Sequence, residues 1–287
     1  IGIFKPMIKF FRKIRYDLME KKNTGKYFKY AFGEIVLVVI GILIALSINN
    51  WNTNRLNNQV EKVILNNLKK DLMLELDNLD SHKTMQNIWI NSGTEILKNY
   101  DSNDGFLVDD EFLASINDLM IRSAFLPTKP TYQTIENTGK IDLISNRNLK
   151  EEILIYYKDI SWFSKNTTDN NTYLVDQLVN NKLIELTFFQ TKSFSKELRE
   201  ESTVFDIENY KLQKSNRFIE QVQKELNRLD KSLNLINVVS FRMFLANLQI
   251  DFAQKSESDT RNLIKSLEIE LNNLNHRHIF FFQFCYF

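Results

Sequence analysis

The sequence predicts a mainly α-helical protein, with one N-terminal transmembrane helix followed by a domain built as an antiparallel helical bundle. Residues 31–48 are apolar apart from Glu34 and Ser47, which is the composition of a membrane-spanning helix. Only 7 glycines and 3 prolines occur in 287 residues, so turn signals are few and long helices are favoured over a sheet. Elsewhere, apolar residues recur every three or four positions, the spacing of one helical face.

Residues 1–30 form a basic segment, with nine Lys or Arg residues against Asp17 and Glu20 and a net charge of +7. Its apolar residues at helical spacing are Met7, Phe11, Ile14 and Leu18. This pattern predicts an amphipathic helix on the anionic inner leaflet, so the lipid bilayer is the first expected partner. Met7 begins MIKFFRKIR as a natural start would, and residues 1–6 are expected to be upstream translation.

Residues 31–51 are the predicted transmembrane helix. The 18 residues at 31–48 give a helix of about 27 Å, close to the ~30 Å of bilayer hydrocarbon, and Trp51 lies where aromatic side chains meet the headgroups. A core helix would carry a polar stripe, which residues 35–46 lack. A cleaved signal peptide is the other alternative, because Ala45-Leu46-Ser47 resembles a cleavage site, but the long basic segment favours an uncleaved anchor.

Two features inside the span are candidate contacts. Glu34 lies in its first turn, either as a stop near the headgroups, paired with Lys26 or Lys29, or as a polar contact with another helix or a partner subunit. Small residues on one face would let a second span approach closely. The candidate membrane and packing contacts are Gly33, Glu34, Gly41, Ala45 and Trp51.

The distribution of charge predicts the topology. Subtracting residues 1–51 from the chain's 37 basic and 36 acidic residues leaves 28 and 33, a net charge of −5. By the positive-inside rule, residues 1–30 stay in the cytoplasm and the domain at 52–275 lies across the membrane. That domain has no basic face for phosphate groups, so no nucleic-acid partner is expected. Cys285 is the only cysteine, which excludes an intrachain disulfide framework or a cysteine-based metal site.

Two stretches carry a family resemblance. MIKFFRKIR, followed by YAFGEIVLVVIGILIALSINNWN, closely resembles the N-terminus of a family of uncharacterised single-pass membrane proteins of Bacteroidetes, especially flavobacteria, whose signature is GEIxLVVIGILIALxxNNWN. TYQTIENTGKIDLISNRNLKEEILIYY, at 131–157, is a looser match to the same family. The resemblance implies an inner-membrane protein with a periplasmic domain in a Gram-negative cell, and it implies no activity.

The first half of the domain is predicted from apolar spacing. Residues 54–100 form one long amphipathic helix with a break near Gly93, and residues 109–121 form a second helix with acidic residues at its start. A short helix at 132–137 should stop at Gly139 in a left-handed conformation, and Asn148 with Glu151 should begin the next. Residues 187–202 are either a loop or a strand.

The polar residues of the 131–157 stretch have two interpretations. They are Asn137, Gly139, Asp142 and Asn146. The functional interpretation makes them a ligand-facing loop. The structural interpretation makes them helix caps and turn residues, and is favoured.

The second half contains a regular apolar seam, which predicts one helix of a bundle. Its residues are Ile219, Val222, Leu226, Leu229, Leu233 and Ile236. A final helix is predicted at 258–274, capped by Ser256 or Asp259. The aromatic tail at 276–287 is either a frameshifted, non-native end or an apolar segment that docks elsewhere.

Catalytic and metal-binding patterns are missing from the sequence. His82 lies inside the long helix, while His276 and His278 are two positions apart and do not share a helical face. We therefore expect no enzyme activity, cofactor or metal. The leading hypothesis is a non-enzymatic envelope protein whose helical domain organises or joins a protein complex, as a homo-oligomer or with another protein. The alternative is a ligand-binding or sensor module that signals through a separate cytoplasmic partner.

Overall fold

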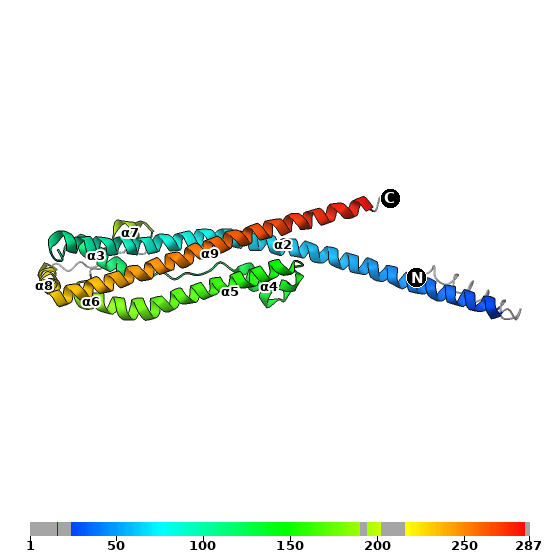
Figure 1. Ribbon diagram of the computed structural model, residues 1–287, viewed down its shortest axis with the longest axis horizontal. Helices are drawn as coiled ribbons and strands as arrows, with labels where there is room; N and C mark the ends of the chain where they lie inside the picture. The colour runs from blue at the N-terminus through cyan, green and yellow to red at the C-terminus, as the bar shows by residue number, and fades with distance from the viewer. Residues whose placement is uncertain (1–15, 17–23, 190–193, 202–215, 285–287) are drawn as a thin grey trace. The chain divides into compact units, whose positions relative to one another are not determined.

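A computed structural model describes residues 16, 24–189, 194–201 and 216–284. Every regular element in these ranges is helical, which confirms the prediction of a mainly α-helical protein. The chain divides into two compact units, residues 1–60 and 61–287, and helix α2 (Thr24–Asn103) supplies residues to both (Figure 1). The basic helix predicted near the N-terminus lies outside the described residues, apart from Tyr16 and the start of α2.

In the first unit, residues 24–60 are helical throughout. The large apolar side chains from Phe32 to Ile48 are exposed, so no part of the protein that the structure describes buries them. This helix is long and apolar enough to cross a membrane. Helix α9 (Leu229–Phe284) is also long and apolar enough to cross a membrane, but 33% of its most apolar stretch is buried inside the protein.

The second unit contains three long helical segments. The first is α2 from Glu61 onward. The second is a continuous run of α5 (Arg147–Asp169), the π-helix η2 (Asn170–Asn180) and α6 (Asn181–Leu186), which together we call the α5 run. The third is α9. Figure 1 shows α9 running opposite in direction to the other two segments.

Side-chain contacts fix the register of these segments. Along α2 and α9, Lys69 pairs with Glu268 at 2.6 Å and Lys83 with Glu257 at 2.7 Å, so the two helices are antiparallel. Along the α5 run and α9, the contacts are Asn146 with Glu270, Tyr156 with Thr260, and Thr167 with Gln249. From one of these pairs to the next, the residue number rises along the α5 run by as much as it falls along α9. The antiparallel register therefore holds over the length of α5.

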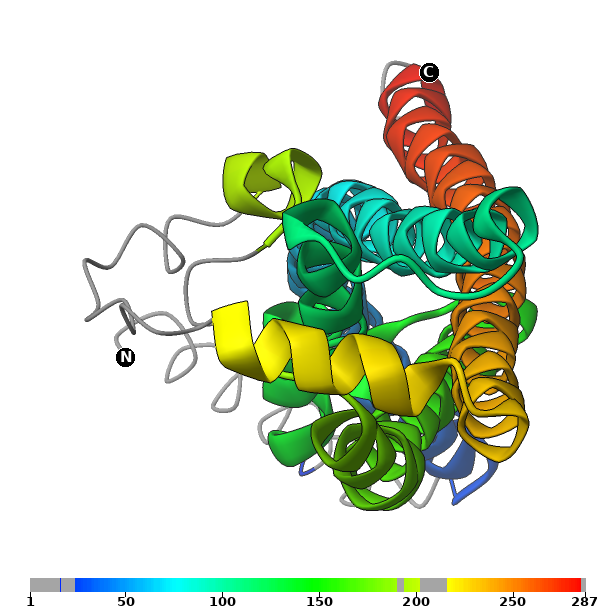
Figure 2. The ribbon, with the colours of Figure 1, turned by 90° about the vertical axis from the view of Figure 1, so that its left-hand side faces the viewer.

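Shorter elements connect the three segments. They are α3 (Asp110–Met120), α4 (Pro130–Asn137), the 3-10 helix η1 (Lys140–Leu143), α7 (Lys196–Glu201) and α8 (Asn216–Leu226). The extended residues 121–129 run back along α2 between α3 and α4, and we call residues 121–146 the return segment. Figure 2 shows α8 lying across the end of the long helices, next to the start of α9.

The apolar faces of the three segments meet in two large clusters. One contains Leu68, Leu72 and Phe163, together with Leu267 of α9. The other contains Trp89, Ile96, and Val239 of α9, with the apolar face of α3. The buried residues of α2 recur every three or four positions, from Leu65 and Leu68 to Trp89 and Ile96, which is why one face of this helix is buried along the second unit.

The predicted break at Gly93 is wrong, because α2 continues as a helix to Asn103. A Cβ atom at position 93 would lie 2.5 Å from Cγ of Met243 and 2.6 Å from its sulfur atom. The glycine therefore lets α9 approach α2 closely, and it does not end the helix.

The seam predicted as one helix is divided between two. Helix α8 ends at Leu226, which is buried, and α9 begins at Leu229, which is 81% exposed. The physical reason is a turn at 227–228, where the Asn227 side chain accepts a hydrogen bond from the Phe106 N–H at 3.0 Å. The predicted helix at 258–274 is part of the longer α9.

Three further helix boundaries can be compared with prediction. Asp109 caps α3 by accepting a hydrogen bond from the Phe112 N–H at 2.8 Å, which confirms the acidic start. Asn146, not Asn148, caps α5, because its side-chain oxygen accepts from the Leu149 N–H at 3.2 Å. In the 187–202 stretch, residues 196–201 form a helix and residues 187–189 are irregular; residues 190–193 and 202 lie outside the described residues.

Candidate functional site

The candidate contacts of the predicted span all lie on α2 in the first unit. A Cβ atom added at Gly33 or Gly41 would meet nothing within 4 Å, and Ala45 is exposed. Glu34 is half-buried, and the Trp51 ring carries the Arg55 guanidinium 5.7 Å from its centroid. The small residues therefore leave an open surface on this part of the helix, as close approach of a second helix requires.

The four candidate loop residues lie around the start of α5. Asn137 is the exposed last residue of α4, and Gly139 has a φ of +68°, which confirms the predicted left-handed conformation. Asp142 pairs with Lys150 at 3.2 Å. Asn146 caps α5 and also donates a side-chain hydrogen bond to Glu270 of α9 at 2.7 Å. The structure thus gives turn, pairing and capping roles to three of these residues.

A row of buried carboxylates on α2 holds the return segment. Glu61 accepts from the Ser145 N–H at 2.7 Å, Asp71 from the Thr131 N–H at 2.9 Å, and Glu75 from the Thr128 N–H at 2.6 Å. Burial raises the pKa of Glu75, while its hydrogen bond from Thr128 acts in the opposite direction. These backbone donors lack helical or sheet partners, and the carboxylates satisfy them.

This row was not predicted from the sequence, because acidic residues on a long helix normally face water. A signal was present, since Asp71 and Glu75 share the helical face of Leu68, Leu72 and Leu79. Charged residues on an apolar face indicate a buried polar partner.

A second polar arrangement surrounds the end of α3. Arg242 is fully buried and donates to the carbonyl oxygens of Leu119 and Ile121, both at 3.1 Å, and its guanidinium lies 4.0 Å from the centroid of the Trp89 ring. Burial lowers the pKa of Arg242 to about 9, so it stays charged at neutral pH. The positive charge lies at the C-terminal end of a helix, where the helix dipole favours it.

Asp118 joins three elements on the same side of the second unit. It accepts from the Ser92 hydroxyl at 2.8 Å and from the Ser195 N–H at 3.1 Å, linking α3 to α2 and to the start of α7. Burial raises its pKa, and the hydrogen bonds from Ser195 and Ser92 oppose that rise.

His82 lies in a buried polar layer between the three helical segments. Its ring meets Phe125 and Phe163 edge-on at 5.4 and 5.6 Å, and its Nε2 atom lies 3.3 Å from the Gln86 amide nitrogen. Burial lowers the pKa of His82 to about 4, with the Gln249 side chain acting in the opposite direction. The ring is therefore neutral at pH 7.

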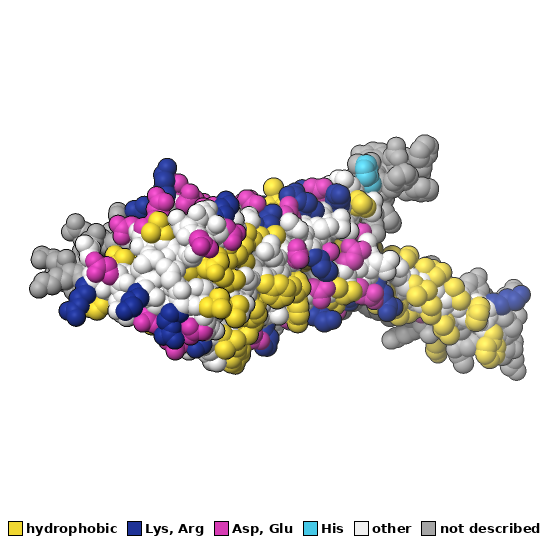
Figure 3. Space-filling model, turned by 60° about the vertical axis from the view of Figure 1, so that its left-hand side comes forward, with side chains coloured by type: hydrophobic (Ala, Val, Ile, Leu, Met, Phe, Trp, Pro, Cys, Tyr) yellow, Lys and Arg dark blue, Asp and Glu magenta, His cyan; other side chains and the backbone are white. Residues whose placement is uncertain are grey.

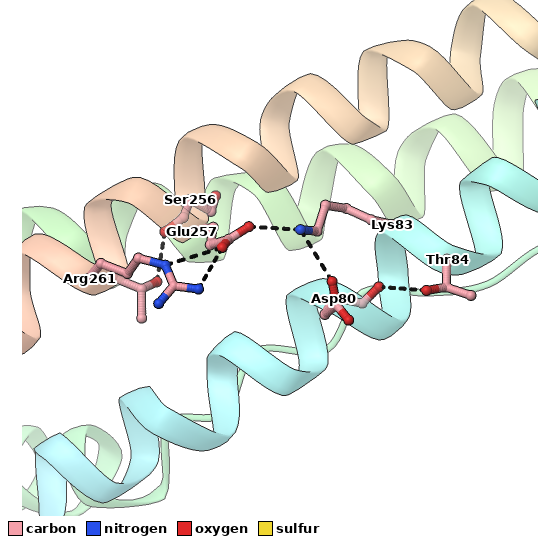
Figure 4. A network of polar contacts seen from close by, with 7 residues as sticks. Asp80, Lys83, Thr84, Ser256, Glu257 and Arg261 are labelled. Carbon is pink, nitrogen blue, oxygen red and sulfur yellow. Dashed lines mark hydrogen bonds and ion pairs between the residues drawn. The ribbon is translucent and has the colours of Figure 1, made fainter.

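An ion-pair network joins α2 to α9 at the surface (Figure 4). Lys83 pairs with Glu257 at 2.7 Å and with Asp80 at 3.3 Å, and Arg261 pairs with Glu257 at 2.8 Å. The hydrogen bond to Glu257 raises the pKa of Lys83, and the same bond lowers the pKa of Glu257.

An exposed aromatic face lies along the α5 run and α9. We define it by four exposed residues, Trp162, Leu178, Phe241 and Phe244, and by the half-buried Phe252. Trp162 contacts Phe252 edge-on at 5.3 Å, and the rings of Phe241 and Phe244 stack at 6.4 Å. Figure 3 shows hydrophobic side chains gathered in a patch on the second unit. The α9 residues of this face recur at helical spacing, a signal that sequence analysis did not use.

An open hollow of about 280 Å³ adjoins this face between the α5 run and α9. Its apolar lining comes from Leu178, Val179, Val238 and Phe241. The remaining lining residues are Gln177, Asn181, Lys182 and Asn237. The α5-run side of the hollow is formed by the π-helix η2 and the start of α6, and π-helical turns are rare and frequent at functional sites.

Within the described ranges, no group of three or more His, Cys, Asp or Glu side chains could hold a metal ion. Neither the curated proteins nor the solved structures contain a match to this chain. A family model does match residues 34–207, from the predicted span to beyond α7. The chain belongs to this family, which is described as a family of unknown function (DUF6090).

Proposed function

We propose that this protein is a membrane-anchored, non-enzymatic envelope protein that joins a protein complex through its aromatic face. The proposal places residues 31–51 across the inner membrane, residues 1–30 in the cytoplasm and the helical domain in the periplasm. The single observation that carries the proposed interaction is the exposed aromatic face with its adjoining hollow.

The single span is supported by the difference between the two apolar helices. The side chains of α2 from Phe32 to Ile48 are exposed, which suits contact with lipid. The apolar residues of α9 include Leu235, Val239 and Leu267, which pack in the core of the second unit. We therefore propose that α9 is a core helix, and that the chain is a single-pass protein of the Bacteroidetes group that its N-terminal signature resembles.

Protein contact is the use that best suits the aromatic face. Trp162 is 54% exposed, Leu178 53%, Phe241 36% and Phe244 58%, which corresponds to two fully exposed large side chains. At ~200 Å² per side chain, this is roughly 400 Å² of apolar surface. Patches of this size on monomeric proteins often mark interaction sites, and aromatic residues supply most interface hot spots.

A non-enzymatic role is supported by what the buried charges do. Glu61, Asp71, Glu75 and Asp118 each accept hydrogen bonds from backbone N–H groups of other segments. The hollow, where a small substrate would fit, has no carboxylate or histidine among the described residues that line it. The buried polar groups thus have a role in positioning the return segment and α3.

Affinity purification of the tagged full chain from detergent-solubilised membranes tests the proposal. Trp162→Glu should reduce recovery of the co-purifying protein, whether a second tagged copy or another chain, at least tenfold. Leu74→Glu is the matched control, because Leu74 is 59% exposed on α2, outside the aromatic face. Equal recovery with both variants would refute the proposed role of the face.

A ligand-binding module is the second candidate, and the hollow is the observation that favours it. Its mixed apolar and amide lining suits a small, mainly apolar molecule with one or two polar groups. Native mass spectrometry of the purified chain would detect such a ligand. A ligand displaced by Val238→Trp, and kept in Leu74→Glu, would favour this second function over the first.

A further inference from the structure

We propose that two copies of this chain associate through the aromatic face, with Phe244 of each copy seated in the hollow of the other. This inference rests on the proposed function, because it names the protein that occupies the same face. The contact is self-complementary and has two-fold symmetry.

The face carries both halves of such a contact. Phe244 is 58% exposed and lies one helical turn from Phe241, which lines the hollow. In a two-fold contact each copy presents the same patch, so a projecting side chain and a recess must lie side by side on one surface. Phe244 and the hollow meet this condition.

The hollow has the size and chemistry to receive a phenyl ring. Its volume is about 280 Å³, whereas an apolar cavity of ~150 Å³ already holds benzene. Leu178, Val238 and Phe241 supply apolar walls. Gln177, Asn181 and Asn237 offer amide groups that could bond the partner's backbone beside the inserted ring.

The exposed apolar area of the aromatic face is close to that of one side of a standard dimer interface. A standard interface buries about 800 Å² on each partner, of which ~57% is apolar, or roughly 450 Å². The aromatic face offers roughly 400 Å² by the exposed fractions of its four most exposed members. Two identical faces would therefore bury an interface of ordinary size.

The charges beside the face favour an identical partner. Lys165 pairs with Asp169 on α5, Lys182 with Glu185 on α6, and Lys255 with Asp259 on α9. Each of these helices thus carries positive and negative side chains beside the face, and the two members of each ion pair belong to the same helix. A strongly acidic or basic partner would find no complementary rim, whereas two copies would not repel each other.

Site-specific photo-crosslinking of the full chain in membranes of the producing cells tests this inference. With p-benzoylphenylalanine in place of Phe244, irradiation should give an adduct of twice the 34.0 kDa chain mass. Mass spectrometry should join position 244 to a peptide containing 177–182 or 237–241. The same probe in place of Leu74 should give no such adduct.

A second measurement uses the purified chain in detergent. Phe244→Glu should weaken self-association at least tenfold in sedimentation equilibrium. Its helicity should be unchanged, because Phe244 is exposed. The control variant Leu74→Glu should associate as the wild type does. An unchanged dissociation constant for Phe244→Glu would overturn the inference.

The crosslinking outcomes also separate this inference from the proposed function. An adduct between position 244 and a different protein would overturn self-association and support the proposed function. Absence of any adduct at position 244, together with complex recovery unaffected by Trp162→Glu, would overturn both.

Discussion

Neutral His82 should make the stability of the helical domain depend on pH between 6.5 and 4. The pKa of this group falls from its ordinary 6.5 to about 4 in the folded protein because burial penalises the charged ring. Between these pH values the unfolded chain therefore binds a proton at His82 that the folded chain does not bind. The contribution of neutral His82 to the unfolding free energy is fully present above pH 6.5 and is lost as pH falls toward 4. The loss should be about 2 kcal/mol at pH 5 and about 3 kcal/mol at pH 4.

The perturbation that isolates this effect is His82→Gln, which keeps a polar side chain but cannot take up a proton. Glu75 and Asp118 also titrate, and their raised pKa values contribute stability at low pH that is lost as pH rises. Both groups are present in both proteins, so the difference between wild type and variant removes their contribution.

The assay is urea unfolding of the full chain in non-ionic detergent, followed by circular dichroism at pH 7, 5 and 4. Relative to the variant, the wild type should lose about 3 kcal/mol of unfolding free energy between pH 7 and pH 4. Parallel profiles for the two proteins would refute the reasoning, since they would mean that His82 titrates equally in the folded and unfolded chains.

Three further predictions concern packing and membrane placement. Leu226→Ala should lower the unfolding free energy by about 2–5 kcal/mol in urea unfolding, because Leu226 is buried. Leu229→Ala should change it by less than about 0.5 kcal/mol, because Leu229 is exposed. Equal losses for the two variants would contradict the division of the seam between α8 and α9. Reporter fusions should show a cytoplasmic N-terminus and an exported domain, and an active cytoplasmic reporter fused after residue 200 would contradict this topology. The protein should resist carbonate extraction with its N-terminus intact, whereas a mature chain beginning at Ile48 would show that the apolar run belongs to a cleaved signal peptide.

Local patterns were sufficient to predict most of the helices. The spacing of apolar residues predicted α2 from residue 54 onward, and the acidic residues at 109–111 predicted the start of α3. Both features depend on neighbours within one or two helical turns. The left-handed Gly139 was predicted for the same reason. These features are properties of short stretches of chain.

The errors occurred where residues distant in sequence decide the structure. Apolar spacing continues without change across the junction of α8 and α9, but Asn227 bonds to Phe106, 121 positions earlier, and the chain turns there. Gly93 lies inside the helix, and Met243 of α9 occupies the space that a side chain would take there. The buried row on α2 was missed because its donors belong to the return segment, whose path no local pattern specifies.

The aromatic face could have been found in part. Phe241, Phe244 and Phe252 follow helical spacing, but the same spacing also describes a core stripe. Whether this stripe of α9 is buried or exposed depends on the position of the α5 run. That position is fixed by contacts such as Thr167 with Gln249.

The polar contacts that fix the register of α9 also limit how the domain can move. They recur at several levels along the helix: Lys69 with Glu268, Lys83 with Glu257, Asn146 with Glu270, and Tyr156 with Thr260. Sliding by one residue would displace a helix by ~1.5 Å and lengthen all of these contacts together. Piston motion of one helix past its neighbours is therefore disfavoured, and a force applied to α9 is passed to α2 and α5 through these contacts.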